Sequence, residues 1–338
     1  MQLKENYSLL NLNTFGLDVK TKKFLSINSV NEIKEYLNCE KIEIGKTLVL
    51  GSGSNILFQN NYDGLVLKSN IMGIHELEKN DDSVILEVGS GVIWDELVTY
   101  AVERNYGGIE NLSLIPGTVG AAPIQNIGAY GVEFEEVFVS LDAINLITNE
   151  LKTFKKEECE FDYRDSIFKR KLKNKYLITK VVVKLSLSPI LNVSYRAIRE
   201  YLQENDCKTL NVKSVSEIVK QIRNSKLPNP SKIGNAGSFF KNPIIDQNVF
   251  DVLKSKYEDL VFYKIGPNQY KIPAGWLIEK TGLKGKRIGN VGVHNKQALV
   301  LVNHGNANGS ELVNLAEEIK TRIYDKFNIN LKTEVNIV

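Results

Sequence analysis

Histidine and cysteine are scarce in this 338-residue sequence, which holds three of each. So few histidines leave little material for His-ligated zinc sites or Ser-His-Asp triads, and we expect any acid–base chemistry to use other side chains. Cys39, Cys159 and Cys207 are odd in number, far apart and without the spacing of metal ligands. We therefore expect no metal site, and we expect a reduced protein of the cytoplasm.

An excess of charge of one sign is also absent, as is a long apolar run. The formal net charge is +3 and no Lys/Arg run forms a stripe, so nucleic-acid binding is not expected. The first residues, Met1–Tyr7, have no basic region followed by an apolar stretch, and no segment has the pattern of a membrane span. The length is that of two or three domains with a substantial core.

Charged residues are missing altogether from Asn111 to Val132, although they make up a quarter of the whole chain. Glycine and proline recur too often there for a helix, and they break the continuous apolar pattern of a membrane span. The segment is therefore predicted to be irregular, buried backbone that must find hydrogen-bond partners. Two interpretations stand about equally: a large polar cofactor supplies the partners, or the segment is a Gly-rich turn packed in a core.

Apolar periodicity predicts a mixture of helices and short strands. The expected helices are Val30–Leu37, Trp94–Glu103, Ser214–Arg223, Asn248–Lys256 and Glu311–Phe327. The expected strands are Thr47–Leu50, Ile56–Phe58, Gly64–Leu67, Ser83–Gly89, Phe138–Ile147, Tyr176–Leu187 and Leu331–Val338. Because the two kinds of element do not alternate strictly, an α+β fold is favoured over a doubly wound sheet. A second domain is expected to begin after Pro189.

The segment Gly51–Asn55, of sequence Gly-Ser-Gly-Ser-Asn, lies between two predicted strands. A dinucleotide-binding fingerprint of the Rossmann type should open a helix, so that interpretation is disfavoured. Successive backbone N–H groups in such a turn can still form a concavity that binds a pyrophosphate. The alternative, favoured by the motif alone, is a hairpin loop rich in small residues.

Two polar positions have both a structural and a chemical interpretation. Arg164 stands beside Asp165, as in a surface ion pair of little consequence. In an apolar pocket the same guanidinium would bind a carboxylate or stabilise an enolate. Ser238 lies in a tight Gly turn with no histidine nearby, so it is either structural or a proton donor, and a hydrolase nucleophile is disfavoured.

The remaining candidates have ordinary interpretations when each is taken alone. Glu334 lies on the opposite face of the last predicted strand from Thr333 and Val335, which is typical of a solvated carboxylate. Arg223 and Lys226, near the end of a predicted helix, either complement the helix dipole or bind phosphates.

Several motifs nevertheless occur together and in a fixed order: Asn13–Gly16, Gly51–Asn55, Ile115–Gly131, Tyr163–Ser166, Gly234–Pro243, Ala274–Ile278 and Glu334. Over nearly the whole chain this combination resembles the UDP-N-acetylenolpyruvoylglucosamine reductase (MurB) family, in its longer form. The resemblance implies an FAD-binding fold of the vanillyl-alcohol-oxidase (PCMH) type in two subdomains, residues 1–70 and 71–188. An α+β substrate-binding domain, residues 189–338, would follow, with its last strand returning to the active site.

The resemblance also implies a non-covalent FAD between the two subdomains, with NADPH as co-substrate. The residues that match its flavin contacts are Gly51, Ser52, Gly53, Ser54, Asn55, Pro116, Gly117, Gln125, Asn126, Gly128, Ala129 and Tyr130. His75 lies outside the Gly-rich segments, so no His-linked flavin is expected. Ala121 and Ala122 stand where some members carry serines, which would remove a hydroxyl contact to the flavin.

In this family, NADPH reduces the flavin and leaves, and UDP-N-acetylglucosamine enolpyruvate is then reduced to UDP-N-acetylmuramate for peptidoglycan synthesis. Arg164 and Glu334 match the residues that stabilise the enolate, and Ser238 matches the one that protonates the carbon bearing the ether. A serine hydroxyl is a poor acid, so nearby cations would have to assist it. The other matched substrate contacts are Tyr195, Arg223, Lys226, Asn242 and Gln297. A monomer is expected.

Two alternatives remain at this point. One is another FAD oxidase or dehydrogenase of the same cofactor fold with a different substrate, which the C-terminal motifs disfavour. The other is a flavin- or nucleotide-binding module without catalytic activity. The presence of Arg164, Ser238 and Glu334 together argues against such a module, because a stable fold does not require all three.

Overall fold

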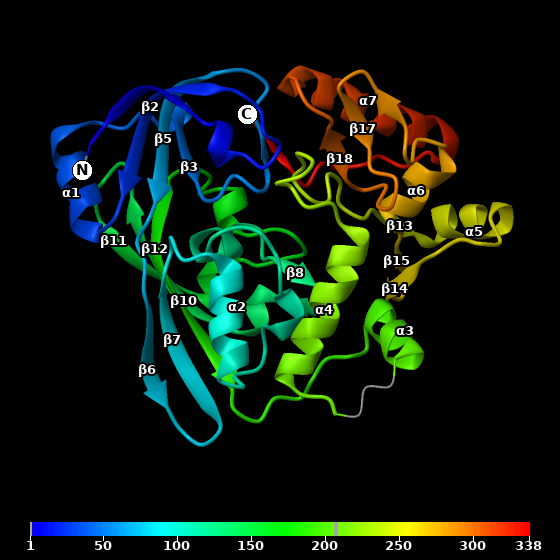
Figure 1. Cartoon of the computed structure of the whole chain (residues 1–338), viewed down its shortest axis with the longest axis horizontal. Helices are drawn as coiled ribbons and strands as arrows, with labels where there is room; N and C mark the ends of the chain where they lie inside the picture. The colour runs from blue at the N-terminus through cyan, green and yellow to red at the C-terminus, as the bar shows by residue number, and fades with distance from the viewer. Residues whose placement is uncertain (1, 206–208) are drawn as a thin grey trace. The chain divides into compact units, whose positions relative to one another are not determined.

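A computed structural model describes residues 2–205 and 209–338 (Figure 1), so Cys207 lies outside the described part. The chain divides into two compact units, which we describe separately. Unit 1 combines residues up to 7, 21–52 and 63–225, and unit 2 combines residues 8–20, 53–62 and 226–338.

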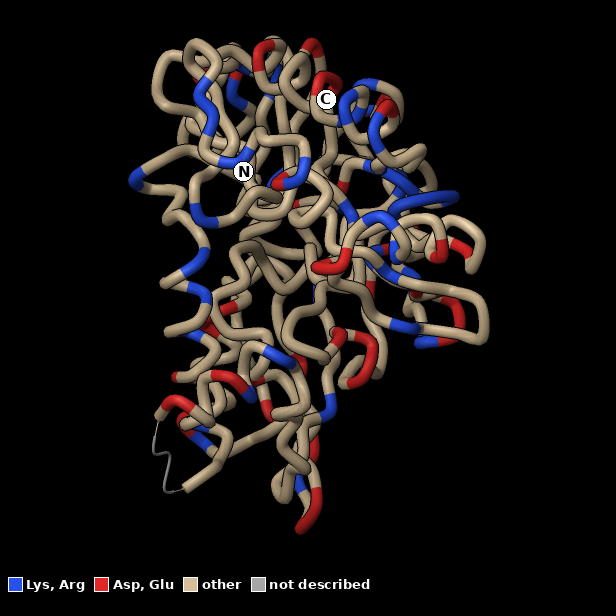
Figure 2. The backbone as a smooth tube through the Cα atoms, turned by 90° about the vertical axis from the view of Figure 1, so that its right-hand side faces the viewer, with Lys and Arg blue, Asp and Glu red and all other residues tan. Residues whose placement is uncertain are grey.

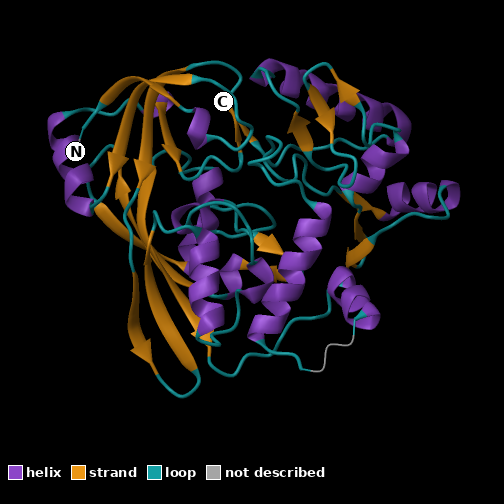
Figure 3. Ribbon diagram, viewed as in Figure 1, coloured by secondary structure: helices purple, strands orange, loops and turns teal. Residues whose placement is uncertain are grey.

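The described part of unit 1 contains two larger sheets and an antiparallel pair of short strands, β8 Gly128–Ala129 and β9 Val132–Glu133; strands are orange in Figure 3. The first has the strand order β1-β2-β5-β3, with β1 Lys4–Ser8, β2 Lys20–Ile27, β5 Tyr62–Ser69 and β3 Thr47–Leu50. The second has the order β11-β10-β12-β7-β6 and is antiparallel throughout, with β11 Leu151–Lys155, β10 Phe138–Asn145, β12 Tyr176–Ser186, β7 Ser83–Gly89 and β6 Ile74–Lys79.

The helices of unit 1 bury apolar faces in its cores. They are α1 Val30–Cys39, α2 Trp94–Glu103, α3 Arg196–Glu204 and α4 Val212–Lys226. Trp94 and Leu97 of α2 belong to the same buried core as Leu86 of β7. Ile198 of α3 packs with Ile222 of α4 in a smaller cluster. The Gly-rich segment that follows α2 contributes residues to the larger core, so that core supports it directly.

Unit 2 holds shorter elements. Its sheets have the orders β13-β15-β14 and β16-β17-β18, and a parallel pair joins β19 to β4. The strands are β4 Ile56–Leu57, β13 Ile244–Asp246, β14 Tyr263–Gly266, β15 Gln269–Lys271, β16 Arg287–Ile288, β17 Val291–Val293, β18 Leu301–Asn303 and β19 Asn336–Ile337. The helices are α5 Gln247–Lys256, α6 Ala274–Lys280 and α7 Gly309–Phe327.

The helices predicted from periodicity are confirmed, with ends that differ by a few residues. The predicted range Trp94–Glu103 is that of α2 itself. Helix α1 begins where predicted because Ser29 caps it and accepts a hydrogen bond from the Glu32 N–H at 3.2 Å. Helices α3 and α6 were not predicted, because each is short and α3 buries only Ile198.

The predicted strand Leu331–Val338 is wrong as a single element. Thr333 forms an antiparallel bridge with Phe240, and Asn336–Ile337 then pairs in parallel with Ile56–Leu57. The segment changes partners halfway along, so no continuous strand forms. Leu331 and Val335 are buried, and Glu334 is half-buried, not fully solvated as its interpretation from sequence alone expected.

The two units cut the chain differently from the predicted domain ranges. Unit 1 extends to Ser225 in α4, which packs on α3 and on Tyr130 within the same unit. Unit 2 includes the early residues 8–20 and 53–62 because they bond to each other and to C-terminal residues, as when Asn303 Nδ2 donates to the Phe15 carbonyl at 2.9 Å. The division of the first 188 residues into two subdomains stays a prediction.

Charged residues of both signs are interspersed along the chain trace in Figure 2. Within the described ranges no helix combines the length and apolar character that crossing a membrane requires, and the longest, α7, has an amphipathic sequence. The same residues contain no cluster of three or more His, Cys, Asp or Glu side chains suited to a metal ion.

Candidate active site

The Gly-rich segment Ile115–Gly131 finds backbone partners within unit 1. Trp94 N–H donates to the Gly117 carbonyl at 3.0 Å, and the Val119 and Gly120 N–H groups donate to carbonyls of residues 92 and 90. A Cβ added at Gly120 would lie 2.5 Å from the Ser90 Cβ, so only glycine allows this approach. The buried backbone therefore does not depend on a ligand for all of its hydrogen bonds.

Asn126 organises the bend in the middle of this segment. It is fully buried and has a left-handed backbone, with φ of 44°. Its side-chain amide donates to Glu133 Oε2 at 2.8 Å, and its Oδ1 accepts from the Glu135 N–H at 3.0 Å. Since the Asn126 side chain bonds to the protein, its backbone is the part available for the predicted flavin contact.

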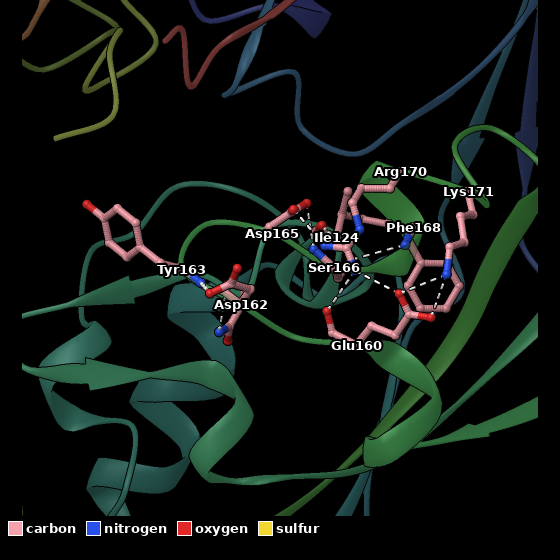
Figure 4. A network of polar contacts seen from close by, with 10 residues as sticks. Ile124, Glu160, Asp162, Tyr163, Asp165, Ser166, Phe168, Arg170 and Lys171 are labelled. Atoms are coloured by element: carbon pink, nitrogen blue, oxygen red, sulfur yellow. Dashed lines mark hydrogen bonds and ion pairs between the residues drawn. The ribbon is translucent and has the colours of Figure 1, made fainter. Parts of the chain in front are cut away.

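Arg164 is directed at the same bend. Its backbone is left-handed, with φ of 53°, and its Nη2 donates to the Gly128 carbonyl. A Cβ on Gly128 would lie 2.7 Å from Arg164 Nη1, so the glycine leaves room for the guanidinium. The neighbouring Asp165 bonds instead to Arg170, at 2.6 Å between Oδ2 and Nη1 (Figure 4). The simple interpretation of Arg164 and Asp165 as a surface ion pair is therefore wrong.

Ser166 fixes the segment that carries Arg164 to the Gly-rich segment. It is fully buried, and its Oγ donates to the Ile124 carbonyl at 2.7 Å (Figure 4). Glu160 binds Arg170 and Lys171 at 2.9 and 3.1 Å on the other side of the same loop. Arg170 thus pairs with both Asp165 and Glu160, while the Arg164 guanidinium bonds to the Gly128 carbonyl.

Tyr130, Tyr195 and Arg223 form a second polar cluster in unit 1. The two tyrosine rings meet edge to face, with centroids 5.3 Å apart. Burial raises the pKa of Tyr130, and the charge of Arg223 and a hydrogen bond to it oppose that rise. Burial also lowers the pKa of Arg223, although the group stays cationic at neutral pH. A half-buried cation bonded to the Tyr130 hydroxyl suits an anionic or carbonyl-bearing ligand.

The Gly51–Asn55 turn crosses from one unit to the other after Ser52. In unit 1, a Cβ on Gly51 would lie 2.9 Å from Thr118 Oγ1. Ser52 Oγ is buried and has no hydrogen-bond partner among the described residues. A buried hydroxyl without a partner beside a glycine that cannot carry a side chain fits a polar group that approaches the backbone closely.

In unit 2, the turn is joined to the C-terminal residues. Gly53 has φ of 68°, and a Cβ there would lie 1.9 Å from the Leu12 carbonyl oxygen. Asn55 Nδ2 donates to the Glu334 carbonyl at 3.3 Å, and the Asn336 N–H donates to the Asn55 carbonyl at 3.1 Å. The turn and Glu334 are therefore neighbours in unit 2.

Ser238 and Glu334 lie on adjacent segments of unit 2. The Glu334 N–H donates to the Phe239 carbonyl at 2.8 Å, and the Phe239 N–H donates to the Leu299 carbonyl at 2.8 Å. Ser238 itself bridges to Val300 through its backbone, and both Ser238 and Glu334 are half-buried. The main chain of the Ser238 segment is therefore held by backbone bonds, while the Ser238 side chain is only half-buried.

The other predicted residues vary in their surroundings. Asn242 Oδ1 accepts from the Ala274 N–H at 2.9 Å and so caps α6, while Gln297 Oε1 accepts weakly from the Leu299 N–H at 3.5 Å. Lys226 is exposed, as is Pro116, whereas Gln125 and Ala129 are half-buried. Sequence reasoning missed Thr118 and Asn111, whose side chains face the Gly-rich turns, because both residue types are ordinary in loops.

Comparison with known proteins gives one consistent result. A family model described as an FAD binding domain matches residues 22–150, and one described as the UDP-N-acetylenolpyruvoylglucosamine reductase C-terminal domain matches residues 229–338. Curated UDP-N-acetylenolpyruvoylglucosamine reductases of Amoebophilus asiaticus and Flavobacterium johnsoniae are 48% and 44% identical to the chain, with 100% of each sequence covered.

A solved structure gives the same fold. The chain matches the reductase (MurB) of Thermus caldophilus with a TM-score of 0.67 at 21% identity, over 99% of this chain and 98% of the other. The predicted α+β fold with an FAD-binding domain is confirmed by this match and by the domain model.

Proposed function

The chain belongs to the UDP-N-acetylenolpyruvoylglucosamine reductase family, and we propose that it catalyses the reaction for which the family is named. In that reaction the enolpyruvyl group of UDP-N-acetylglucosamine enolpyruvate is reduced to the lactyl ether of UDP-N-acetylmuramate, a step of peptidoglycan synthesis. The observation that carries the proposal is identity of 48% to a named reductase over the full length of both proteins.

FAD is the cofactor that the residues of unit 1 fit. Ser52 Oγ, buried without a partner among the described residues, and the side-chain-free Gly51 suit its pyrophosphate. The backbone of residues 125–130 would lie along its ring system, with the Asn126 side chain holding that backbone from inside. When bound, FAD would supply the hydride-transfer chemistry between NADPH and the vinyl carbon of the substrate.

Arg164 is proposed to stabilise the negative charge that develops on the pyruvyl carboxylate of the substrate. Its guanidinium is held by the Gly128 carbonyl, so it does not have to be ordered when the charge appears. A positive group fixed in advance lowers the energy of the transition state more than one that must first leave water. Glu334, whose backbone is held by Phe239 and Asn55, is proposed to act in the same step.

Ser238 is proposed to donate a proton to the carbon that bears the ether oxygen. Its backbone is fixed by a bridge to Val300 and by the main-chain bonds of the adjacent Phe239. Because a serine hydroxyl is a weak acid, a neighbouring cation must favour its ionised form. Lys226, an exposed lysine of unit 2, is proposed for this role.

The nucleotide part of the substrate is proposed to contact Tyr195, Arg223, Lys226, Asn242 and Gln297. Tyr195 contacts the ring of Tyr130, and Tyr130 bonds to Arg223, which supports a common role for Tyr195 and Arg223. Cys39 and Cys159 are free thiols, which supports a reduced, cytoplasmic setting, and we propose that the enzyme acts there as a monomer.

An anaerobic titration that follows the flavin absorbance tests the function. NADPH should bleach the yellow protein, and UDP-N-acetylglucosamine enolpyruvate should then restore the colour without oxygen. Bleaching without recovery would indicate a flavoenzyme with another acceptor. A colourless protein that takes up no added FAD would exclude the whole proposal and favour a module without catalytic activity.

A further inference from the structure

A short strap, residues 190–195, leads from β12 towards α3 and ends at Tyr195. Few apolar contacts hold it: Ile190 is 99% exposed, and an open groove of about 720 Å³ lies along residues 190–194. Val193 is the strap residue that joins the cluster between α3 and α4. The position of the strap therefore depends on polar contacts more than on packing.

Two asparagines supply those contacts, and we call them the asparagine clasp. Asn111 is 1% exposed, and its Nδ2 donates to the Asn192 carbonyl at 2.8 Å and to the Tyr130 carbonyl at 3.0 Å. Asn192 Nδ2 donates in return to the Gly131 carbonyl at 2.9 Å. The clasp joins the strap to the end of the Gly-rich segment, where Tyr130 and Gly131 have φ of 51° and 84°.

Asparagine is required at position 111 by its chemistry. One amide group presents two N–H donors, which serve two carbonyls that lie far apart in the sequence. An aspartate has no donor and would face both carbonyls with negative charge. The Oδ1 of Asn111 is buried without a hydrogen-bond partner among the described residues, which costs stability. The presence of asparagine at position 111 is therefore better explained by the positioning of the strap than by a gain in folding stability.

The clasp lies beside the second polar cluster of unit 1. Tyr130 meets the ring of Tyr195 at the end of the strap, and Arg223 Nη2 donates to the Leu114 carbonyl at 3.2 Å. A buried pair of hydroxyls, Ser113 and Ser216 at 2.8 Å, fastens α4 to the same segment. A shift of the strap would therefore separate Tyr195 from Tyr130 while leaving Arg223 in place.

We propose that Asn111 is a positioning residue that stabilises the Tyr195 strap in its position against Tyr130. This role rests on the proposed function, since it assigns the strap to the binding of UDP-N-acetylglucosamine enolpyruvate. Bonds that favour this position of the strap lower the cost of ordering it around the substrate, so the clasp acts on substrate affinity. It has no part in the transfer of hydride from NADPH.

Steady-state and half-reaction kinetics of Asn111→Leu test the proposal. We expect KM for the enolpyruvyl nucleotide to rise about 10-fold, because the strap must be ordered on binding, while anaerobic flavin reduction by NADPH changes less than about twofold. Asn192→Ala removes the link to Gly131 and the bonds from Ser194 to Asn192 Oδ1 but keeps the carbonyl that Asn111 binds, so it should shift KM in the same direction by less. The Asn192→Ala variant tests the same role if Asn111→Leu fails to fold. Asn145→Leu is the matched control, because Asn145 of β10 bonds to Tyr176 of β12 in the same unit.

Hydrogen exchange provides a readout that does not depend on turnover. In Asn111→Leu, amides of residues 190–196 and 130–132 should exchange faster, while those of β7 should not change. An unchanged KM in a folded variant would overturn the role, as would faster exchange throughout unit 1 with an equal loss in both half-reactions. If the wild-type protein fails to reduce the nucleotide, the proposed function itself is overturned. If the wild type is active and the variant is equally active, only the role of Asn111 is overturned.

Discussion

The candidate residues of the two units are held in place by different kinds of bond. In unit 1, side chains make the positioning bonds. The Arg164 guanidinium donates to the Gly128 carbonyl, the Ser166 hydroxyl donates to the Ile124 carbonyl, and the Asn126 amide donates to the Glu133 carboxylate. In unit 2, the main chain does it: the Glu334 and Phe239 N–H groups bond to carbonyls on adjacent segments. In unit 2, the side chains proposed for chemistry therefore do not themselves make these positioning bonds.

This difference determines what a substitution will change. In unit 1, replacing a side chain removes a structural bond, so position and stability change together. In unit 2, replacing the Ser238 side chain leaves the main-chain bonds of its segment intact, so chemistry should be lost without loss of stability. Each prediction below tests one side of this contrast.

The largest expected effect concerns the packing next to Arg164 in unit 1. Cys159, at the end of a short 3-10 helix (Lys156–Cys159), is fully buried, and burial raises its pKa to about 12. At pH 8 its thiolate fraction should be about 10³-fold below that of an ordinary thiol. Alkylation followed by peptide mass spectrometry should therefore show Cys159 unmodified in native protein, while the exposed Cys39 reacts.

The raised pKa of Cys159 also makes the free energy of unfolding depend on pH. The raised pKa means that the unfolded chain loses this proton first, so the contribution of Cys159 is complete below about pH 8.5 and is lost as the pH rises towards 12. Rapid alkylation of native Cys159 at pH 8 would show that the segment before Arg164 opens readily. It would contradict the view that side-chain packing locks that part of unit 1.

The second prediction concerns Ser238 in unit 2. Ser238→Ala should leave reduction of the flavin by NADPH nearly intact and slow its reoxidation by the nucleotide by roughly 10²-fold or more, the usual effect of removing a general acid. The thermal midpoint should stay within about 1 °C of wild type, because the bonds that hold this segment are made by the main chain. Stopped-flow absorbance and a thermal melt measure the two quantities.

Ser231→Ala is the control for this prediction, since Ser231 is an exposed serine of the same unit whose hydroxyl bonds only to Asn229. Unchanged reoxidation in Ser238→Ala would remove Ser238 from the mechanism. A marked fall in the thermal midpoint would instead show that unit 2 depends on side chains as unit 1 does.

The third prediction compares two asparagines of unit 1 with left-handed backbones. Asn126 has φ of 44° and a buried hydrogen-bond network, whereas Asn174 has φ of 57° and is only half-buried. Asn126→Ala should lower the free energy of unfolding by about 2 to 3 kcal/mol, because buried partners lose their bonds. Asn174→Ala should cost about 1 kcal/mol, the strain of the backbone alone. Equal losses in urea unfolding would mean that the network contributes nothing.

Local pattern explains which parts of the fold the sequence could predict. Helix α2 was predicted to the residue because Trp94, Leu97, Val98 and Ala101 form one apolar face within ten residues. The motifs predicted which segments carry the site. Partners distant in sequence or set by backbone turns could not be predicted, such as the bond from Asn55 to the Glu334 carbonyl, 279 residues away.

The partner of Arg164 could not be predicted from the sequence either, although the candidates are close in the chain. Both Arg164 and Arg170 are near Asp165 in the sequence, and charge alone cannot choose between them. The left-handed backbone at Arg164 turns its side chain to Gly128, and Asp165 then pairs with Arg170. That choice depends on a tertiary arrangement that includes the buried Ser166, so no local pattern contains it.

The smallest effect is expected for Gly128→Ala, which tests whether the position of Arg164 matters apart from its charge. Gly128 does not have a positive φ, so alanine fits the backbone, but its Cβ would lie 2.7 Å from Arg164 Nη1 and 3.0 Å from the Val132 carbonyl oxygen. The flexible guanidinium must move, and kcat should fall about 10-fold, since charge displaced from the developing enolate stabilises it less. Gly45→Ala, whose Cβ would meet nothing within 4 Å, should leave kcat unchanged. If Gly128→Ala retains full kcat with ordinary stability, the bond to Gly128 does not set the working position of Arg164. Side-chain tethering in unit 1 would then serve the fold and not the chemistry.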